Sequence, residues 1–269
     1  MHRQGIATLS FDKRRVGRST GVFRDAMELA ERDARAALRY LRSREDVVDV
    51  RRIAILGLSQ GAVIAPMLAT ETSSVIALVL LAAPAGQKGR MFLDAMGEKL
   101  TTAGMRPDVV KQVVESARHY LDALTGEASP AIVAGYRAAL VRSFVAGGWS
   151  PDQAEGAVKT LGNPATSSLY SVAASTMLSR VKVPVLALYA ANDTVVSSPL
   201  SIPEARRALT DNPDATIREM PDVEHGFKPL VSTASGARDY AGWPISDPAT
   251  LEVIENWLVP RLSGQARGR

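Results

Sequence analysis

The stretch that decides the fold reads Ile53-Ala54-Ile55-Leu56-Gly57-Leu58-Ser59-Gln60-Gly61-Ala62-Val63. An apolar run leads into a serine between two glycines and then into an apolar helical segment. In a strand–turn–helix of the G-x-S-x-G pattern the turn is tight, so small residues are needed two positions before and two after the serine. Gly57 and Gly61 meet that demand. The alternative is a glycine-rich turn whose serine caps a helix, but the preceding strand and following helix favour a nucleophile at Ser59.

Further apolar runs of similar length indicate a mostly parallel sheet. Near-continuous apolar runs are typical of strands that are covered on both faces. The runs span residues 6–11, 53–58, 75–82, 183–189 and, with a weaker pattern, 216–220. Between the first two, apolar residues recur at helical steps at Met27, Ala30, Ala34, Leu38 and Leu41. The alternation of strand, helix and strand predicts an α/β fold.

The middle of the chain interrupts this alternation. Residues 86–180 read as consecutive helical pieces without a convincing strand. We expect them to form a helical cap over an active site, and the alternative is that they pack as extra helices on a flank of the core. Residues 1–85 and 181–262 then form the core, and residues 263–269 form a basic tail that we expect to be disordered.

A serine nucleophile needs a base, and the chain has three histidines. His2 lies at a terminus, and His119 lies within a helical part of the insertion, where a surface or partly buried structural residue is favoured. His225 follows a strand and precedes the last helix, whose first turn is marked by Asp247 and Pro248. The chain order and loop position predict His225 as the base.

The orienting acid is expected just after the strand that precedes the histidine's own strand. Asp193 ends the strong run that begins at residue 183 and leaves room for one helix and one strand before His225. Asp222 and Glu224 are nearer in sequence, but residues of one short loop seldom orient their neighbour's ring, which favours loop solvation for both. A metal site at Glu224 and His225 lacks further ligands.

Composition excludes several classes of protein. Of the 269 residues 46% are hydrophobic and 22% charged, as in globular proteins, and the absence of cysteine excludes disulfides and thiolate chemistry. No apolar run approaches the roughly 20 residues of a membrane span, and residues 1–5 lack the apolar stretch of a signal peptide, so we expect a cytoplasmic protein without a membrane partner. The net charge is +4, but aromatic residues are few and scattered, which argues against nucleic-acid binding.

With these residues placed, the chain resembles the α/β-hydrolase superfamily and, more closely, bacterial carboxylesterases with a helical cap. The resemblance implies Ser59, Asp193 and His225 as the triad, the N–H of Gln60 as an oxyanion donor, and no cofactor. The resemblance is carried by the tight G-x-S-x-G turn around Ser59, called here the elbow, and by three further stretches. These are Gly5-Ile6-Ala7-Thr8-Leu9-Ser10-Phe11-Asp12-Lys13-Arg14-Arg15-Val16-Gly17-Arg18-Ser19, Val181-Lys182-Val183-Pro184-Val185-Leu186-Ala187-Leu188 and Val223-Glu224-His225-Gly226-Phe227.

The sequence also departs from that family. Leu58, Ala62 and Arg15 replace a histidine and two glycines that the family often has at these positions. In the family, three strands and a loop with a second oxyanion donor precede the segment at residues 6–11, so the resemblance implies an N-terminally shortened sheet and weak turnover. We expect residues 6–11 to pair in the sheet, either directly with the elbow strand or with another chain.

The resulting hypothesis is a carboxylesterase that acts through an acyl-enzyme on a small-molecule ester, and the oligomeric state stays open. Met91, Phe92 and Tyr170 are candidates for lining the acyl pocket. A peptidase or thioesterase on the same triad is one alternative. A weakly active or non-catalytic remnant that binds a ligand is another, and labelling by a fluorophosphonate probe separates it from an enzyme.

Overall fold

The computed structural model describes residues 2–23, 26–232, 238–240 and 246–264 of the chain, so part of the predicted tail, residues 265–269, lies outside the described residues. The chain divides into two compact units. The first, called here the sheet unit, comprises Met1–Val22, Ala30–Ala85 and Ala174–Arg269. The second, the helical unit, comprises Phe23–Leu29 and Gly86–Ala173.

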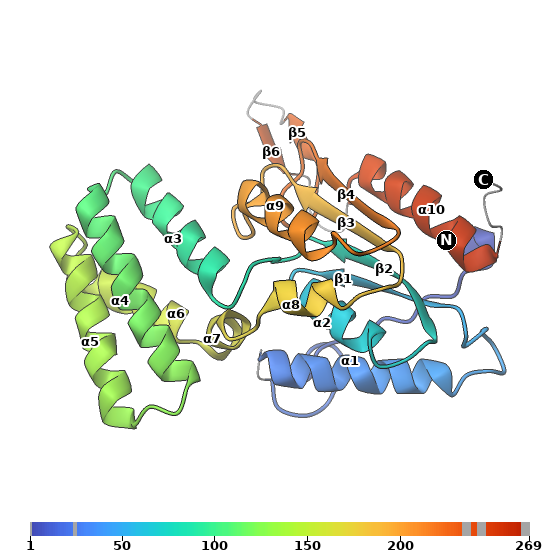
Figure 1. Ribbon diagram of the computed structural model, residues 1–269, viewed down its shortest axis with the longest axis horizontal. Coiled ribbons are helices and arrows are strands. Elements are labelled where there is room, and N and C mark those ends of the chain that lie inside the picture. Colours follow the sequence, from blue (N-terminus) through green and yellow to red (C-terminus); the bar gives the residue numbers. More distant parts are fainter. Residues whose placement is uncertain (1, 24–25, 233–237, 241–245, 265–269) are drawn as a thin grey trace. The chain divides into compact units, whose positions relative to one another are not determined.

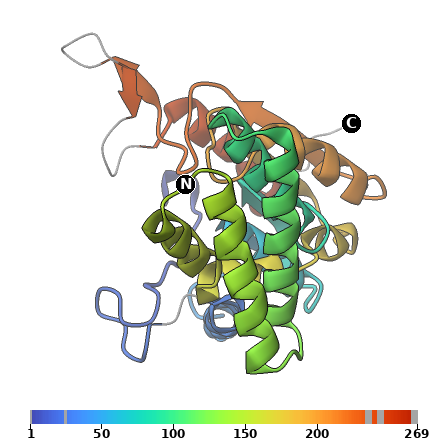
Figure 2. The same ribbon diagram turned by 90° about the vertical axis from the view of Figure 1, so that its left-hand side faces the viewer.

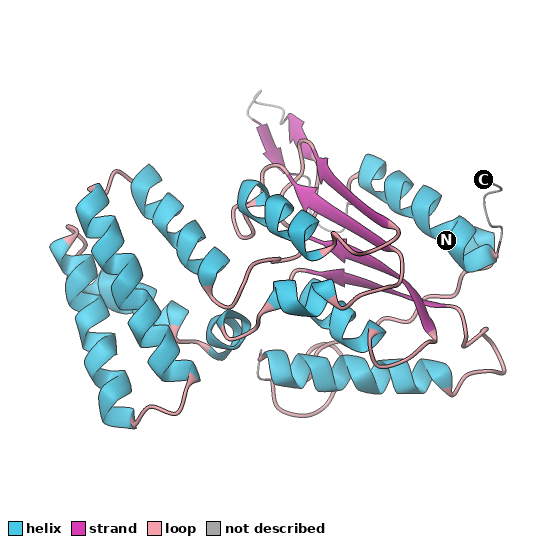
Figure 3. Ribbon diagram, in the orientation of Figure 1, coloured by secondary structure: helices cyan, strands magenta, loops and turns pink. Residues whose placement is uncertain are grey.

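The sheet unit is built on four parallel strands in the order β1-β2-β3-β4 (Figure 3). The strands are β1 (Ile53–Leu58), β2 (Val75–Leu81), β3 (Val185–Ala190) and β4 (Ala215–Met220). All six residues of β3 are buried, as the near-continuous apolar run predicts for a strand covered on both faces. The predicted α/β fold with a parallel sheet is confirmed. A separate two-stranded hairpin, β5 (Leu230–Ser232) and β6 (Arg238–Tyr240), was not expected.

Helices cover both faces of this sheet (Figure 1). One face packs against α1 (Met27–Arg42), α2 (Gln60–Ala69), α8 (Ala174–Ser179) and α9 (Ser198–Ala208), and the other packs against α10 (Pro248–Ser263). Successive residues of β2 alternate between these two layers, since Leu78 and Leu80 point to the first and Ala77 and Val79 to the second. This coverage leaves the carboxyl ends of the strands as the edge where loops can carry a site.

The predicted strand at residues 6–11 is wrong. Among the described residues, β1 pairs with β2 alone, and residues 6–11 have no regular secondary structure. Leu9 is 43% exposed and Phe11 is 52% exposed, while Leu56 and Leu58 of β1 are also exposed. An apolar run forms a strand only when the backbone of a neighbouring strand lies close enough for hydrogen bonds. The local sequence pattern does not show whether such a neighbour is present.

The helical unit consists of α3 (Arg90–Thr102), α4 (Pro107–Thr125), α5 (Pro130–Ala146), α6 (Pro151–Leu161) and α7 (Pro164–Tyr170). In Figure 2, α4 and α5 run side by side, and Val113, Leu121 and Leu140 are fully buried in the core of this unit. Helices α5, α6 and α7 each begin with a capping side chain followed by proline, with caps at Ser129, Ser150 and Asn163. The Ser-Pro and Asn-Pro pairs at these positions therefore mark the starts of helices.

Candidate active site

Ser59 occupies the turn between β1 and α2. Its backbone has φ 53° and ψ −110°, a strained conformation for a residue other than glycine. The Ser59 N–H donates to Leu81 O at 2.8 Å, which ties the turn to the neighbouring strand. Gln60 begins α2, so its N–H is one of the first-turn N–H groups that have no acceptor within the helix. A strained serine beside free helix N–H groups is the geometry of a nucleophile elbow.

The two glycines of the elbow differ in how much space the structure leaves for a side chain. A Cβ at Gly57 would lie 2.3 Å from the carbonyl oxygen of Gly61, and that oxygen belongs to backbone that cannot move aside cheaply. A Cβ at Gly61 would meet nothing within 4 Å. The sequence argument that both glycines are sterically required is thus correct for Gly57 and wrong for Gly61, where the helix leaves open space.

Gly57→Ala is therefore expected to lower the free energy of unfolding by about 3 kcal/mol, the cost of forcing a methyl group into a filled space. Gly61→Ala is the matched control, and we expect it to raise the free energy of unfolding by about 0.5 kcal/mol because alanine favours the helix. Urea unfolding followed by circular dichroism measures both. Equal destabilisation by the two substitutions would contradict this account of the turn.

The acid and the base meet at the ends of β3 and β4. His225 Nδ1 lies 2.7 Å from Asp193 Oδ2, and the Asp193 side chain is 1% exposed. Asp193 Oδ1 accepts the backbone N–H groups of Val195 at 2.7 Å and Val196 at 2.8 Å. Both carboxylate oxygens are thus occupied, and a carboxylate can only accept from the ring. The proton is held on Nδ1, which leaves Nε2 as the basic nitrogen of His225.

Glu224, the residue before His225, holds the shape of the loop that carries the histidine. Glu224 Oε1 accepts the N–H groups of Gly226 at 2.9 Å and Lys228 at 3.2 Å. The N–H of Asn192 donates to Val223 O at 3.1 Å, which joins the acid loop to the histidine loop. The carboxylate of Glu224 thus closes the loop, while Asp193 contacts the ring.

The three predicted triad residues lie at the carboxyl ends of parallel strands of one sheet, Ser59 after β1, Asp193 after β3 and His225 after β4. Within the described part of the chain, a hydrogen bond joins His225 to Asp193 and none joins His225 to Ser59. Contacts between base and nucleophile are often long in unliganded enzymes and tighten when substrate binds. The structure therefore assembles the acid–base pair, and the link to the serine stays a prediction.

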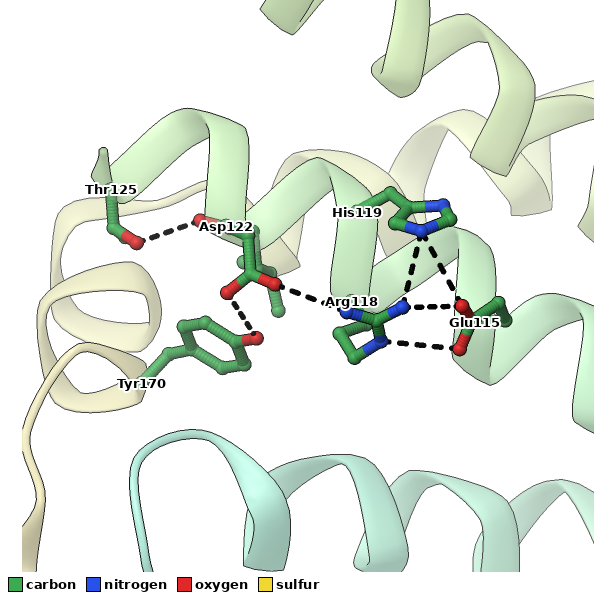
Figure 4. Close-up of polar contacts among 7 residues, drawn as sticks. Glu115, Arg118, His119, Asp122, Thr125 and Tyr170 are labelled. Atoms are coloured by element: carbon green, nitrogen blue, oxygen red, sulfur yellow. Dashed lines mark hydrogen bonds and ion pairs between the residues drawn. The ribbon is translucent and has the colours of Figure 1, made fainter. Parts of the chain in front are cut away.

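The predicted pocket residues belong to the helical unit. Tyr170 is buried there, and its hydroxyl donates to Asp122 Oδ1 at 2.9 Å (Figure 4). Its ring centroid lies 6.5 Å from that of Phe92. Burial raises the pKa of the Tyr170 hydroxyl, so the group stays a neutral donor. The side chain of Met91 lies outside what the structure describes. Phe92 and Tyr170 thus serve the packing of this unit, and their role as an acyl pocket stays a prediction.

His119 takes part in a polar cluster on α4 in the same unit. Its Nε2 lies 3.4 Å from Glu115 Oε1 (Figure 4). Its ring stacks at a tilt on Tyr136, with centroids 5.4 Å apart. Arg118 pairs with Glu115 and Asp122 in the same cluster. These contacts stay within the helical unit and support the structural interpretation of His119.

Among the described residues, no group of three or more His, Cys, Asp and Glu side chains lies together in a way that could hold a metal ion. Nor is any helix in the described ranges both long and apolar enough to cross a bilayer.

The sequence matches the alpha/beta hydrolase family over residues 2–236. No curated protein matches it significantly. Among solved structures, it is similar to an esterase of Pyrococcus furiosus, Pf2001, with 17% identity, a TM-score of 0.46 and coverage of 81% of this chain and 63% of that one. It is also similar to a hydrolase of Pseudomonas aeruginosa, with 17% identity, a TM-score of 0.43 and coverage of 95% and 78%. The chain thus spans less than two thirds of the esterase's length, and these likenesses concern the fold alone.

Proposed function

Because this chain belongs to the alpha/beta hydrolase family, we propose that it is a serine hydrolase that cleaves carboxylic esters through an acyl-enzyme on Ser59. The observation that carries the proposal is the 2.7 Å contact between His225 Nδ1 and the buried carboxylate of Asp193. A buried carboxylate with both oxygens occupied holds one tautomer of the imidazole, and a general base needs that tautomer. The strained backbone of Ser59 supports the nucleophile's role independently.

The reaction proceeds in two halves. Ser59 Oγ attacks the ester carbonyl carbon while its proton passes to His225 Nε2, and the carbonyl oxygen becomes an oxyanion beside the N–H of Gln60. The tetrahedral intermediate collapses, the proton moves from Nε2 to the departing alkoxide, and an alcohol leaves. Water then attacks the acyl-enzyme with His225 again as base, which releases the carboxylic acid and restores the serine. Asp193 keeps the ring oriented and stabilises the imidazolium in both halves.

A fluorophosphonate probe tests this assignment before any substrate is known. We expect the purified chain to be labelled in one position, which mass spectrometry of its peptides places on Ser59, and to hydrolyse short p-nitrophenyl esters. Comparing the rates of hydrolysis of the ester, a thioester and a peptide amide separates an esterase from the thioesterase and peptidase alternatives. Labelling elsewhere, or no labelling together with no hydrolysis, would remove the assignment and favour a non-catalytic binding protein.

Three further expectations accompany this proposal. The partner is a small-molecule ester, the protein functions in the cytoplasm, and the helical unit serves as a cap that lines the acyl pocket. Assembly into a homo-oligomer is checked by light scattering of the purified protein. The proposed mechanism uses the three side chains of the triad, the backbone N–H of Gln60 and water.

A further inference from the structure

The loop that carries the acid, residues 191–197, is called here the acid loop, and its start is tied to the end of β4. The N–H of Ala191 donates to Met220 O at 2.9 Å, and the N–H of Asn192 donates to Val223 O at 3.1 Å. Both are backbone bonds, so they do not depend on which side chains stand at these positions. The start of the acid loop is therefore held by the fold itself.

The other end of the acid loop is tied to β4 through side chains. The loop runs into α9, whose first residue, Ser198, is only 2% exposed. The hydroxyl of Ser198 donates to Glu219 Oε1 on β4. Glu219 is paired in register with Tyr189, which packs in the layer that contains α9 (Figure 1). Paired residues of parallel strands share a face, so Glu219 lies on the side of the sheet that α9 covers.

The start of α9 lacks the local devices that usually fix a helix end. Ser197, its N-cap residue, makes no side-chain hydrogen bond to the helix, and the first turn contains no acidic residue. An N-cap acceptor and negative charge near the first turn both stabilise a helix start. Glu219 supplies an acceptor and a negative charge to this turn from a neighbouring strand. The place where the acid loop ends is therefore set by β4.

Asp193 depends on the shape of the acid loop. Its Oδ1 accepts the N–H groups of Val195 and Val196, close to the end that Glu219 holds, and its Oδ2 contacts His225. A shift of that end would move the two N–H donors and the carboxylate with them. His225 itself follows β4, so one strand sets the position of the base and the shape of the loop that carries the acid.

We propose that Glu219 is a positioning residue of the active site, which acts through Ser198 to hold Asp193 against His225. This inference deepens the proposed function, since it concerns the same acid–base pair. The hydrogen bond between Ser198 and Glu219, at a helix start without its own cap, carries it. Glu219 is exposed, so its replacement by alanine leaves no cavity in the core.

The kinetic test uses the full chain and four variants. In Glu219→Ala and in Ser198→Ala, we expect kcat to fall about tenfold and KM to stay within about twofold, because the catalytic geometry changes and substrate binding does not. The double variant should lose no more than about tenfold, since the two residues act through one contact. Glu219→Gln keeps an acceptor for Ser198, and we expect it to retain kcat within about threefold.

Proton NMR of the His225 Nδ1–H reads the same geometry without any turnover. A proton shared with a carboxylate in a short bond gives a downfield signal, which loss in His225→Gln assigns. We expect this signal to move upfield or to disappear by exchange with water in Glu219→Ala and Ser198→Ala, and to persist in Glu219→Gln. The measurement therefore tests the role of Glu219 separately from ester hydrolysis.

Arg218→Ala is the matched control, because it removes an exposed charged side chain of β4 that lies on the opposite face of the sheet. We expect its kcat to change by less than about twofold and its Nδ1–H signal to stay. A lower unfolding temperature in Glu219→Ala with unchanged kcat and unchanged signal would overturn the positioning role, as would losses that multiply in the double variant. Absence of both labelling and hydrolysis in the wild type would overturn the proposed function, and the signal alone would then decide the role of Glu219.

Discussion

Replacing Ser59 with alanine is expected to lower kcat for p-nitrophenyl ester hydrolysis by at least about 10⁴-fold and to abolish fluorophosphonate labelling. The substitution removes the atom that forms the acyl-enzyme, and no other group can take over the covalent step. The fold should persist, because the Ser59 side chain makes no capping hydrogen bond to α2 and the residue is only partly buried. Steady-state kinetics, together with a thermal unfolding curve, measures both effects.

Ser73→Ala supplies the matched control for this prediction. Ser73 is an exposed serine between α2 and β2, at the opposite end of the same helix from Ser59. Its loss is expected to change kcat by less than about twofold, since surface substitutions away from a site have small effects. Turnover that survives in purified Ser59→Ala would show that another group performs the chemistry.

The second large effect is expected for Asp193→Asn, with a loss of about 10⁴-fold in kcat, the cost of the wrong imidazole tautomer. The amide oxygen can still accept the N–H groups of Val195 and Val196, so the loop keeps its shape. The amide nitrogen then faces His225 Nδ1 and donates to it. The ring proton moves to Nε2, and the nitrogen that should accept the serine proton is blocked.

Glu224→Gln tests the rival acid on the same loop. The amide oxygen of the new side chain can accept the N–H groups of Gly226 and Lys228 as the carboxylate does. We therefore expect a loss of less than about tenfold, because a neutral acceptor replaces a charged one in the same geometry. An equal loss in Glu224→Gln and Asp193→Asn would mean that the loop's shape, and not the pairing of Asp193 with His225, limits the rate.

Several features of the fold were predictable because they depend on local pattern. The strands β1 to β4 follow apolar runs, and the caps of α5, α6 and α7 follow Ser-Pro or Asn-Pro pairs. The pairing of Asp193 with His225 was also predictable, because parallel strands bring their carboxyl ends to one edge and chain order then limits the candidates. These conclusions need no knowledge of distances.

Other features depend on which segments meet in space. Residues 6–11 have the composition of a strand, but a strand needs a partner's backbone, and among the described residues β1 has a partner strand on one side only. Gly61 looks as constrained as Gly57 in the sequence, but only at Gly57 does another backbone segment occupy the space of a Cβ. The hairpin of β5 and β6 was missed because three-residue strands carry too short a pattern to detect.

The sequence by itself determined the parallel sheet and the candidates for the nucleophile, the acid and the base, since each follows from periodicity, local sterics or chain order. Only the tertiary structure decided that Glu224 closes its loop while Asp193 holds the ring, and that Lys13 reaches Gln60 across 47 residues. Hydrogen bonds between side chains depend on positions that differ by a few tenths of an ångström. Such positions arise from the packing of distant segments, and no local pattern in a sequence records them.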